Sequence, residues 1–363
     1  MSEIKRNVFL TGGTGLVGSY LLKLLLMHQC NVYLLVRSNN KKLPESRVKN
    51  VLSFWGVKSS LRRKIKILNG DMTKDSLGLS KKSLAYLKTN IDEIIHCAAL
   101  TRFNSELDDL RSVNVEGTRR MCNLGIKWSR EGRLKKIDYL STVYICGNYK
   151  DIFTENDLAL GQTFFTPYEQ SKFEAEVLIH EYRKKIWIDI FRPPTVSGEF
   201  RTGKILSFNQ ALYQALHILN LELFDYLPGE KNYPFKLVFI NDLCESIVKV
   251  ALNTSRVNQT YHIFNEQCLT LDEMIKIACL FLNVRRPKLI SPFLFNKKTT
   301  SAQRGLIKYN LMFLNTKAQL SSNLTFGILK AFNFSFNPIN KSSILRSIEY
   351  AASVGFVKKL KKK

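Results

Sequence analysis

The sequence is poor in acidic residues, and it has neither a long apolar run nor grouped metal ligands. Thirty Asp and Glu residues stand against 55 Lys and Arg residues, which gives a formal net charge of +25 over 363 residues. No stretch approaches the ~18 consecutive apolar residues that cross a bilayer, and glycines and Lys23 interrupt the most apolar N-terminal segment. We therefore expect a cytoplasmic protein without a membrane-spanning helix.

Cysteine and histidine show no pattern typical of a disulfide framework or a metal centre. The seven cysteines are odd in number, and no two are spaced as C-x-x-C. Several lie in apolar runs, which indicates reduced cysteines inside a cytosolic protein. The five histidines show no ligand spacing. We predict no metal site.

The excess of positive charge indicates which partners the protein attracts, and it carries no information about the fold. A surface this basic attracts acidic proteins, anionic lipids, nucleic acids or polyphosphate ligands. The Lys and Arg residues are spread along the chain, and no nucleic-acid-binding motif accompanies them. We therefore expect no nucleic-acid partner and favour an acidic protein or a lipid.

A glycine-rich turn near the N-terminus is the most informative segment. An apolar run over 7–10 predicts a buried strand, glycines at 12, 15 and 18 follow it, and an apolar helix then extends to about His28. This spacing lets the chain turn sharply, lets backbone approach a phosphate, and lets the helix lie close to the sheet. The helix N-terminus offers its N–H groups to the anion. The predicted dinucleotide site includes Thr11, Gly12, Thr14, Gly15, Leu16, Val17 and Gly18.

Strands and helices are expected to alternate along the first half of the chain. Expected strands cover 7–10, 32–36, 65–68, 93–95, 137–140 and 187–191, with short later strands at 237–240 and 260–264. Expected helices cover 16–28, 47–55, 81–88, 106–128 and 167–184. This alternation predicts an α/β fold with a doubly wound parallel (Rossmann) sheet. Ligands of such sheets bind beyond the carboxyl ends of the strands.

We divide the chain into a cofactor domain and a smaller lobe. Residues 1–195 form the predicted NADP-binding Rossmann domain, and 235–265 return to it. Residues 196–234 and 266–363 form the predicted substrate-binding lobe and C-terminal region, which is mostly helical. The sequence contains no internal repeat, and no long linker separates the two parts.

The second strand ends in Arg37, where an NAD-binding protein normally carries an acidic residue. A guanidinium pairs with a 2′-phosphate in a fork, whereas a carboxylate would repel it. We therefore expect NADPH rather than NADH, against the alternative that Arg37 is a solvated residue at a strand end. Asp71, at the end of the third strand, suits contact with the adenine.

Tyr168 and Lys172 are four residues apart in an expected helix, so both lie on one face about one turn apart. A lysine ammonium beside a phenol favours the phenolate and lowers the pKa of tyrosine from its usual value of about 10. The pair then provides a proton donor that works near neutral pH. No other tyrosine of the fourteen has a lysine at this spacing.

Together these features resemble an extended short-chain dehydrogenase/reductase. The glycine turn, Asn114 in a long helix, Ser141-Thr142 after a strand and the Tyr168/Lys172 pair carry the resemblance. A finer similarity is to the thioester-reductase branch, which comprises fatty acyl-CoA reductases of the male-sterility type and the terminal reductase domains of peptide and polyketide synthases. This similarity covers about 6–265. It is carried by Leu34–Arg37, Gly70-Asp71, Leu77–Ser80, Ile95–Ala99, Asn114–Thr118 and Arg192–Gly198.

The resemblance implies a role for each matching residue. Tyr168 would donate a proton to the substrate carbonyl or polarise it, Lys172 would hold the ribose hydroxyls and tune Tyr168, and Thr142 would hydrogen-bond the same oxygen. Asn114 would kink its helix and hold a water that relays protons. Two alternatives stay open, since Asn114 can be an ordinary helix residue and Thr142 can merely end a strand. Further cofactor contacts are implied at Arg37, Arg47, Asp71, Met72, Ala98, Ala99 and Pro194.

The resemblance also implies an activity, which is NADPH-dependent reduction of an acyl thioester to an aldehyde, with a second reduction giving the alcohol. The donor would be acyl-CoA or an acidic acyl carrier protein, and a protein of charge +25 attracts either. Two alternatives stay open. One is other extended-reductase chemistry, on nucleotide sugars, ketones or steroids, and the other is a non-catalytic NADP-binding regulator.

The C-terminal segment predicts a basic amphipathic helix. Ile344, Leu345 and Ile348 lie on one side of an expected helix from 343 to 360, and lysines dominate 358–363. Such a helix binds anionic lipid with ~1 kcal/mol per charge, which would give a peripheral membrane contact. A solvated, frayed tail is the alternative.

Overall fold

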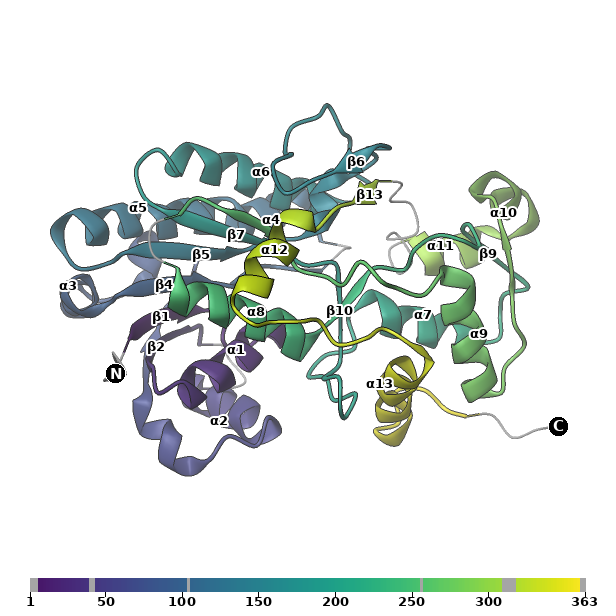
Figure 1. The fold of residues 1–363 in the computed structure, drawn as a ribbon, viewed down its shortest axis with the longest axis horizontal. Helices are drawn as coiled ribbons and strands as arrows, with labels where there is room; N and C mark the ends of the chain where they lie inside the picture. Colours follow the sequence, from purple (N-terminus) through teal and green to yellow (C-terminus); the bar gives the residue numbers. More distant parts are fainter. Residues whose placement is uncertain (1–5, 39–42, 103–104, 255–256, 309–317, 360–363) are drawn as a thin grey trace.

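The computed structural model describes residues 6–38, 43–102, 105–254, 257–308 and 318–359 (Figure 1). Its strands are β1 (Asn7–Thr11), β2 (Asn31–Val36), β3 (Ile65–Asn69), β4 (Glu93–His96), β5 (Lys136–Leu140), β6 (Ile152–Phe153), β7 (Ile188–Arg192), β8 (Thr195–Ser197), β9 (Tyr226–Pro228), β10 (Leu237–Phe239), β11 (Thr260–His262), β12 (Lys288–Ile290) and β13 (Gln319–Leu320). Its α-helices are α1 (Leu16–Met27), α2 (Pro44–Phe54), α3 (Lys81–Asn90), α4 (Leu107–Asn114), α5 (Glu116–Glu131), α6 (Pro167–Tyr182), α7 (Ala211–Asn220), α8 (Ile240–Asn253), α9 (Leu271–Leu282), α10 (Pro292–Lys298), α11 (Ser301–Lys308), α12 (Asn323–Ala331) and α13 (Lys341–Ser353).

Seven parallel strands form the central sheet, in the order β11-β7-β5-β4-β1-β2-β3. The order reverses at β1, which pairs with β2 on one side and β4 on the other, so that Phe9 lies between Tyr33 and Ile94. The doubly wound parallel fold predicted from the sequence is therefore confirmed. Ligands of such sheets bind at this reversal, beyond the carboxyl ends of the strands.

The strands are apolar on both faces because helices cover both sides of the sheet. Along β1, Val8 and Leu10 belong to a core shared with α1 and α8. Phe9 points the other way, into a core shared with α5, where its ring meets the edge of the Trp128 ring at 5.6 Å between centroids. This alternation explains why a buried parallel strand is a continuous apolar run in the sequence.

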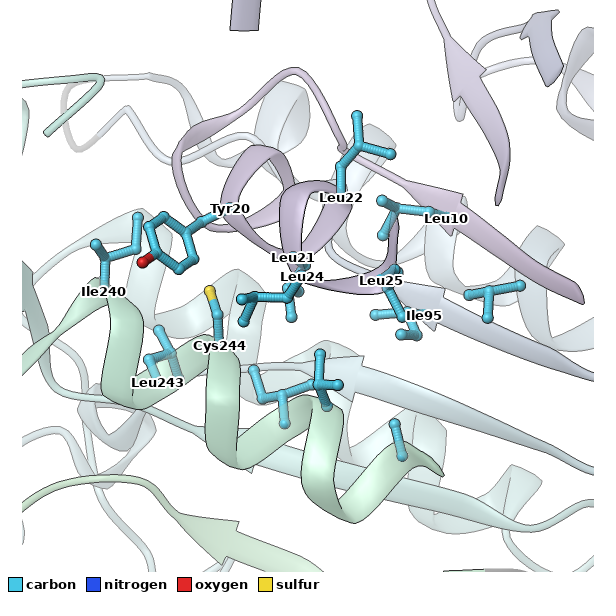
Figure 2. Packing of buried hydrophobic residues seen from close by; sticks show 14 of the residues in the cluster. Leu10, Tyr20, Leu21, Leu22, Leu24, Leu25, Ile95, Ile240, Leu243 and Cys244 are labelled. Atoms are coloured by element: carbon cyan, nitrogen blue, oxygen red, sulfur yellow. The ribbon is translucent and has the colours of Figure 1, made fainter. Parts of the chain in front are cut away.

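Helix α8 comes from late in the chain and packs against α1 (Figure 2). Figure 2 shows Tyr20 and Leu24 of α1 facing Ile240, Leu243 and Cys244 of α8. All five side chains are buried. The helix that follows the glycine turn is therefore covered by α8, a segment far from it in sequence.

Two expected elements differ in the structure. The long helix expected over 106–128 is two helices, α4 and α5, which separate at Val115 (φ −94°, ψ −61°). The strand expected at 237–240 is β10, which lies outside the main sheet and pairs with β8. The other short strand, expected at 260–264, is β11 and does join the sheet, beside β7. The division of the chain into a cofactor domain and a lobe stays a prediction.

Helices α7, α9, α10, α11 and α13 gather at the end of the molecule away from α3 (Figure 1). They share a separate core, in which Ile344 and Ile348 of α13 are fully buried. The apolar side of the C-terminal helix, for which the sequence left a membrane contact open, therefore packs inside the protein. The helix also ends at Ser353, and Lys361–Lys363 lie outside the described residues. No helix in the described ranges combines the length and the hydrophobicity of a membrane span.

A buried ion cluster lies near the amino-terminal ends of the central strands β4, β5 and β7. Lys136 Nζ donates to Asp138 Oδ1 at 3.0 Å and to Asp189 Oδ2 at 2.9 Å, and Glu93 Oε1 lies 3.7 Å away. Arg6 donates to the other Glu93 oxygen at 3.1 Å. The side chains of Lys136 and the three acids are at most 1% exposed. Water does not solvate these charges, so each depends on its partners.

We predict that Lys136→Met lowers the free energy of unfolding by about 3–5 kcal/mol, because it leaves buried carboxylates without their central cation. Urea denaturation measures the loss. Lys184→Met is the matched control, because Lys184 pairs with Glu181 on the surface at 2.8 Å and surface pairs contribute little. An unchanged midpoint for Lys136→Met would show that the cluster does not stabilise the sheet.

Candidate active site

The glycine turn connects β1 to α1 at the reversal of the strand order. Gly12 has φ +73°, and a Cβ atom there would lie 2.7 Å from the backbone of Cys97 and Ala98. A Cβ atom on Gly18 would lie 2.3 Å from the Gly12 carbonyl oxygen. Both positions therefore require glycine, because only glycine lets α1 and the end of β4 approach the turn this closely.

Helix α1 begins without a capping side chain. Its first residue is Leu16, and the residue before it, Gly15, has no side chain that could hydrogen-bond the first turn. That turn also contains no acidic residue. Its first N–H groups and the positive end of its dipole are therefore available to an anion. A phosphate bound at the turn would satisfy these donors.

Two cavities meet at the turn and form one groove across the carboxyl ends of the strands. They have volumes of about 250 and 200 Å³, and Gly12, Gly15, Cys97 and Ala99 line both. The first is also lined, among the residues predicted from sequence, by Thr14, Arg37, Arg47, Asp71, Met72 and Ala98. The second is also lined by Leu16, Val17, Gly18, Thr142, Tyr168, Lys172 and Pro194. Thr11 and Asn114 do not line the groove.

Two arginines lie close together at the end of the groove beside β2. Arg47 donates to Thr14 Oγ1 at 2.8 Å and to the Arg37 carbonyl at 2.7 Å. Burial and the nearby charge of Arg37 lower the pKa of Arg47. Arg37 is largely exposed, and its Nε lies 3.9 Å from Asp71 Oδ2. An anion bound beside the two guanidiniums would relieve their repulsion, so this end of the groove fits a phosphate.

Tyr168 lies in the first turn of α6, and a capping box fixes the start of this helix. Thr166 Oγ1 accepts from Glu169 N, and Glu169 Oε2 accepts from Thr166 N, both at 3.3 Å. Pro167 occupies the first helical position. These features hold Tyr168 in place at the cavity wall. Burial, with a smaller effect of Glu169, raises the pKa of Tyr168.

Lys172 lies one turn further along α6, in the same cavity wall. Its Nζ donates to the Tyr139 hydroxyl at 2.5 Å and to the Leu140 carbonyl at 2.8 Å. Burial lowers the pKa of Lys172 to about 7. The prediction that Lys172 lowers the pKa of Tyr168 is wrong, because the pKa of Tyr168 is raised. Burial is the main cause of the raised pKa of Tyr168, and the amine of Lys172 hydrogen-bonds to Tyr139.

Thr142 and Ser141 follow β5, and both line this cavity. Thr142 Oγ1 donates to the Pro193 carbonyl and accepts from Tyr144 N, both at the long distance of 3.3 Å. Ser141 Oγ is buried and has no hydrogen-bond partner within the described part of the chain. Only Thr142 was predicted from the sequence, whereas both residues line the cavity in the structure.

Asn114 and Thr11 lie behind the groove. Asn114 ends α4 at the break before α5; its Oδ1 accepts from Leu100 N at 2.8 Å, and its Nδ2 donates to the Leu100 carbonyl and Ser171 Oγ at 3.0 Å. It therefore ties the helix break to α6, and the water relay stays a proposal. Thr11 Oγ1 accepts from Ala98 N at 3.2 Å and so supports the turn from behind.

Tyr139, the hydrogen-bond partner of Lys172, was not predicted from the sequence. Strand β5 is buried on both faces, yet it carries Lys136, Asp138 and Tyr139 in sequence. The sequence did contain a signal for such a contact, because polar side chains in a buried strand need buried hydrogen-bond partners. The sequence did not show which partners these would be.

A doubly wound sheet, a glycine turn and a Tyr-x-x-x-Lys helix beside a strand-ending threonine define an extended short-chain dehydrogenase/reductase, a class of nicotinamide-dependent oxidoreductases. A family model described as "Male sterility protein" matches residues 10–247. The chain belongs to this family, and the resemblance to the thioester-reductase branch is confirmed.

Two kinds of relative share this sequence pattern. A linear gramicidin synthase of Brevibacillus parabrevis is 26% identical over 275 residues, covering 73% of this chain and 5% of that protein. Fatty acyl-CoA reductase 1 of Homo sapiens is 34% identical over 157 residues, covering 40% of this chain and 30% of that protein. The chain therefore spans less than a third of either relative.

Solved structures share the fold over nearly the whole chain. The terminal R domain of the myxalamid PKS-NRPS pathway has a TM-score of 0.84 at 25% identity, covering 99% of this chain and 94% of that one. UDP-glucuronic acid 4-epimerase from Bacillus cereus, solved in complex with NAD, has a TM-score of 0.68 at 16% identity, covering 96% and 99%. The epimerase shows the shared fold alone.

We predict that Gly18→Ala lowers the free energy of unfolding by about 1–3 kcal/mol, because the added methyl group meets the Gly12 carbonyl and forces α1 away from the turn. Urea denaturation measures this, and titration calorimetry with NADP follows the accompanying loss of affinity. Gly327→Ala is the control, because Gly327 lies in α12 with open space around its Cβ position and alanine favours a helix there. Equal stability of Gly18→Ala and wild type would contradict the close approach.

Proposed function

We propose that this protein uses NADPH to reduce an acyl thioester to an aldehyde, with the acyl group carried by coenzyme A or by an acyl carrier protein. One observation carries the proposal. Tyr168, Lys172 and Thr142 line one end of a groove whose other end holds Arg37 and Arg47, with the glycine turn between. A dinucleotide lying across the turn would reach from the arginines to the tyrosine.

The residues of the groove fit NADPH. Arg37 and Arg47 would bind the 2′-phosphate, the uncapped start of α1 would bind the pyrophosphate, and Asp71 would contact the adenine. Lys172 would hold the ribose next to the nicotinamide. NADPH supplies the hydride when bound, and the protein supplies binding and orientation.

Tyr168 and Thr142 are proposed to act on the carbonyl oxygen of the thioester. Hydride addition to the carbonyl carbon places negative charge on this oxygen, and two hydroxyl donors would stabilise it. The raised pKa of Tyr168 keeps its phenol protonated at neutral pH, so that it can donate. The hemithioacetal then loses its C–S bond. One hydride and one proton thus convert the thioester to an aldehyde and a thiol, and repetition on the aldehyde would give the alcohol.

The thioester donor is proposed to be anionic. Coenzyme A carries phosphates, and acyl carrier proteins are acidic, so a chain of net charge +25 attracts either. One relative is named as a fatty acyl-CoA reductase and another as a subunit of linear gramicidin synthase, so both kinds of donor enter the proposal. A direct comparison of the two donors would decide between them.

We predict that Tyr168→Phe lowers kcat/KM by about 10²–10⁴-fold, because the general acid is lost while the ring remains. The assay follows NADPH oxidation with acyl-CoA and acyl-carrier thioesters and identifies the aldehyde or alcohol by mass spectrometry. Tyr182→Phe is the matched control on the same helix, because its hydroxyl donates to Asn123 at 2.6 Å, outside the groove.

Two results would count against this scheme. Unchanged turnover in Tyr168→Phe would remove Tyr168 from the mechanism. A wild-type protein that binds NADPH but reduces none of the thioesters would overturn the proposed reaction and leave the cofactor assignment standing.

We predict that Arg37→Ser raises the KM for NADPH by about 10- to 100-fold, because a charge-assisted contact to the 2′-phosphate is lost. The KM for NADH stays near its wild-type value, since NADH has no such phosphate. Initial rates with each cofactor measure the ratio, and Arg130→Ser, at the exposed end of α5, is the control. An unchanged ratio would mean that Arg37 is only a solvated residue.

A further inference from the structure

Tyr139 is a buried phenol directly behind the proposed catalytic pair. It lies on β5, between β4 and β7 in the sheet, and is 1% exposed. It lines neither cavity of the groove, so it touches neither the proposed cofactor nor the substrate. Its hydroxyl nevertheless lies 2.5 Å from Lys172 Nζ.

Tyr139 contacts the ammonium of Lys172 in two ways. The hydroxyl accepts a hydrogen bond, and Nζ also lies 4.2 Å from the centroid of the ring, where the π-face attracts a cation. The Leu140 carbonyl takes a second N–H at 2.8 Å. An ammonium has three donors, so these two contacts leave a third N–H for a ligand in the cavity that Lys172 lines.

The charged groups around Lys172 are already neutralised by other partners. Glu176, on the same helix, forms a bidentate pair with Arg192 at 2.8–3.2 Å. From the end of β4, burial lowers the pKa of His96 to about 3 and raises the pKa of Cys97 to about 12. Burial likewise raises the pKa values of Tyr139 and of Tyr168, so these groups are neutral at pH 7. The close contacts of the ammonium are therefore uncharged.

We propose that Tyr139 is a positioning residue that favours the protonated form of Lys172 and keeps its third N–H directed at the ribose site. The proposal rests on the function proposed above for Lys172. A phenol suits this task because its oxygen accepts a hydrogen bond from the ammonium and carries no charge of its own at pH 7. Its place in the middle of the sheet keeps it fixed, whereas a lysine side chain alone is flexible.

The test replaces the hydroxyl and keeps the ring. In Tyr139→Phe, the protonated amine loses one hydrogen-bond acceptor in a buried site, so its titration midpoint moves to lower pH by about one pH unit. Carbon-13 NMR of protein labelled at lysine Cε measures the midpoint without any ligand. Lys172 is the resonance that titrates near neutral pH and disappears in Lys172→Arg.

A second readout is the binding of NADPH at pH 7. Tyr139→Phe weakens binding about 10-fold in the wild-type background, because the amine is less often charged and is poorly directed. In a Lys172→Met background the same substitution changes binding less than 2-fold, because Tyr139 acts through Lys172. A purely structural tyrosine would weaken binding equally in both backgrounds.

Tyr33→Phe is the matched control. Tyr33 is also a buried sheet tyrosine whose hydroxyl is hydrogen-bonded, to Tyr86 at 2.9 Å, and it has Lys66 at 5.8 Å from its ring. Tyr33→Phe should leave the Lys172 titration midpoint and the affinity for NADPH unchanged. If Tyr139→Phe folds poorly, 3-fluorotyrosine at position 139 keeps the packing and weakens the acceptor, so the Lys172 midpoint moves in the same direction.

The outcomes separate this proposal from the proposed function. An unchanged Lys172 midpoint in Tyr139→Phe, or equal weakening of binding in both backgrounds, overturns the role of Tyr139. A wild-type protein that does not bind NADPH at all overturns the proposed cofactor, and the NMR titration then still decides whether Tyr139 sets the charge of Lys172.

Discussion

The close approach of α1 to the turn before it is the constraint on which the rest of the structure depends. A single Cβ atom at Gly12 or Gly18 would collide with backbone, so the groove exists only because side chains are missing there. Helix α8 packs against α1 and buries its apolar side chains. The first N–H groups of the helix are thereby held at the reversal of the strand order, where both cavities meet.

The two ends of the groove use buried charge in different ways. Beside β2, two guanidiniums repel each other, which favours an anionic ligand. At the other end, burial keeps Tyr168 protonated and leaves Lys172 close to its titration midpoint at neutral pH. One end thus gains affinity from charge, while the other holds a protonated phenol and an amine whose protonation is easily changed. Such a separation is typical of sites that bind a cofactor and transfer protons.

The features that the sequence predicted well have local signals. The six strands of the first half and the glycine turn follow from apolar runs and from spacing, and Tyr168 and Lys172 reach one cavity because a helix repeats every 3.6 residues. The break at Val115 follows directly after Asn114, where the resemblance implied a kink, whereas helical periodicity alone continues across it. Two short strands looked alike, and only tertiary neighbours decided that β11 joins the sheet and β10 does not.

Side-chain partners were the least predictable part of the site. The sequence paired Lys172 with Tyr168 because they share a helix, whereas the nearest phenol comes from β5. The apolar side of α13 looked available to lipid, yet another core covers it. In both cases the deciding contact joins segments far apart in the chain, and a pattern within one segment carries no information about it.

The packing of α8 on α1 also bears on how the protein is made. A ribosome releases the first Rossmann strands long before α8 and β11, so a nascent chain that ends near residue 195 exposes Tyr20 and Leu24 on an uncovered helix and leaves the β7 edge unpaired. Such surfaces aggregate easily. Residues 1–195 therefore lack the segments that cover α1 and pair with β7, and synthesis must pass β11 before the seven-stranded sheet is complete.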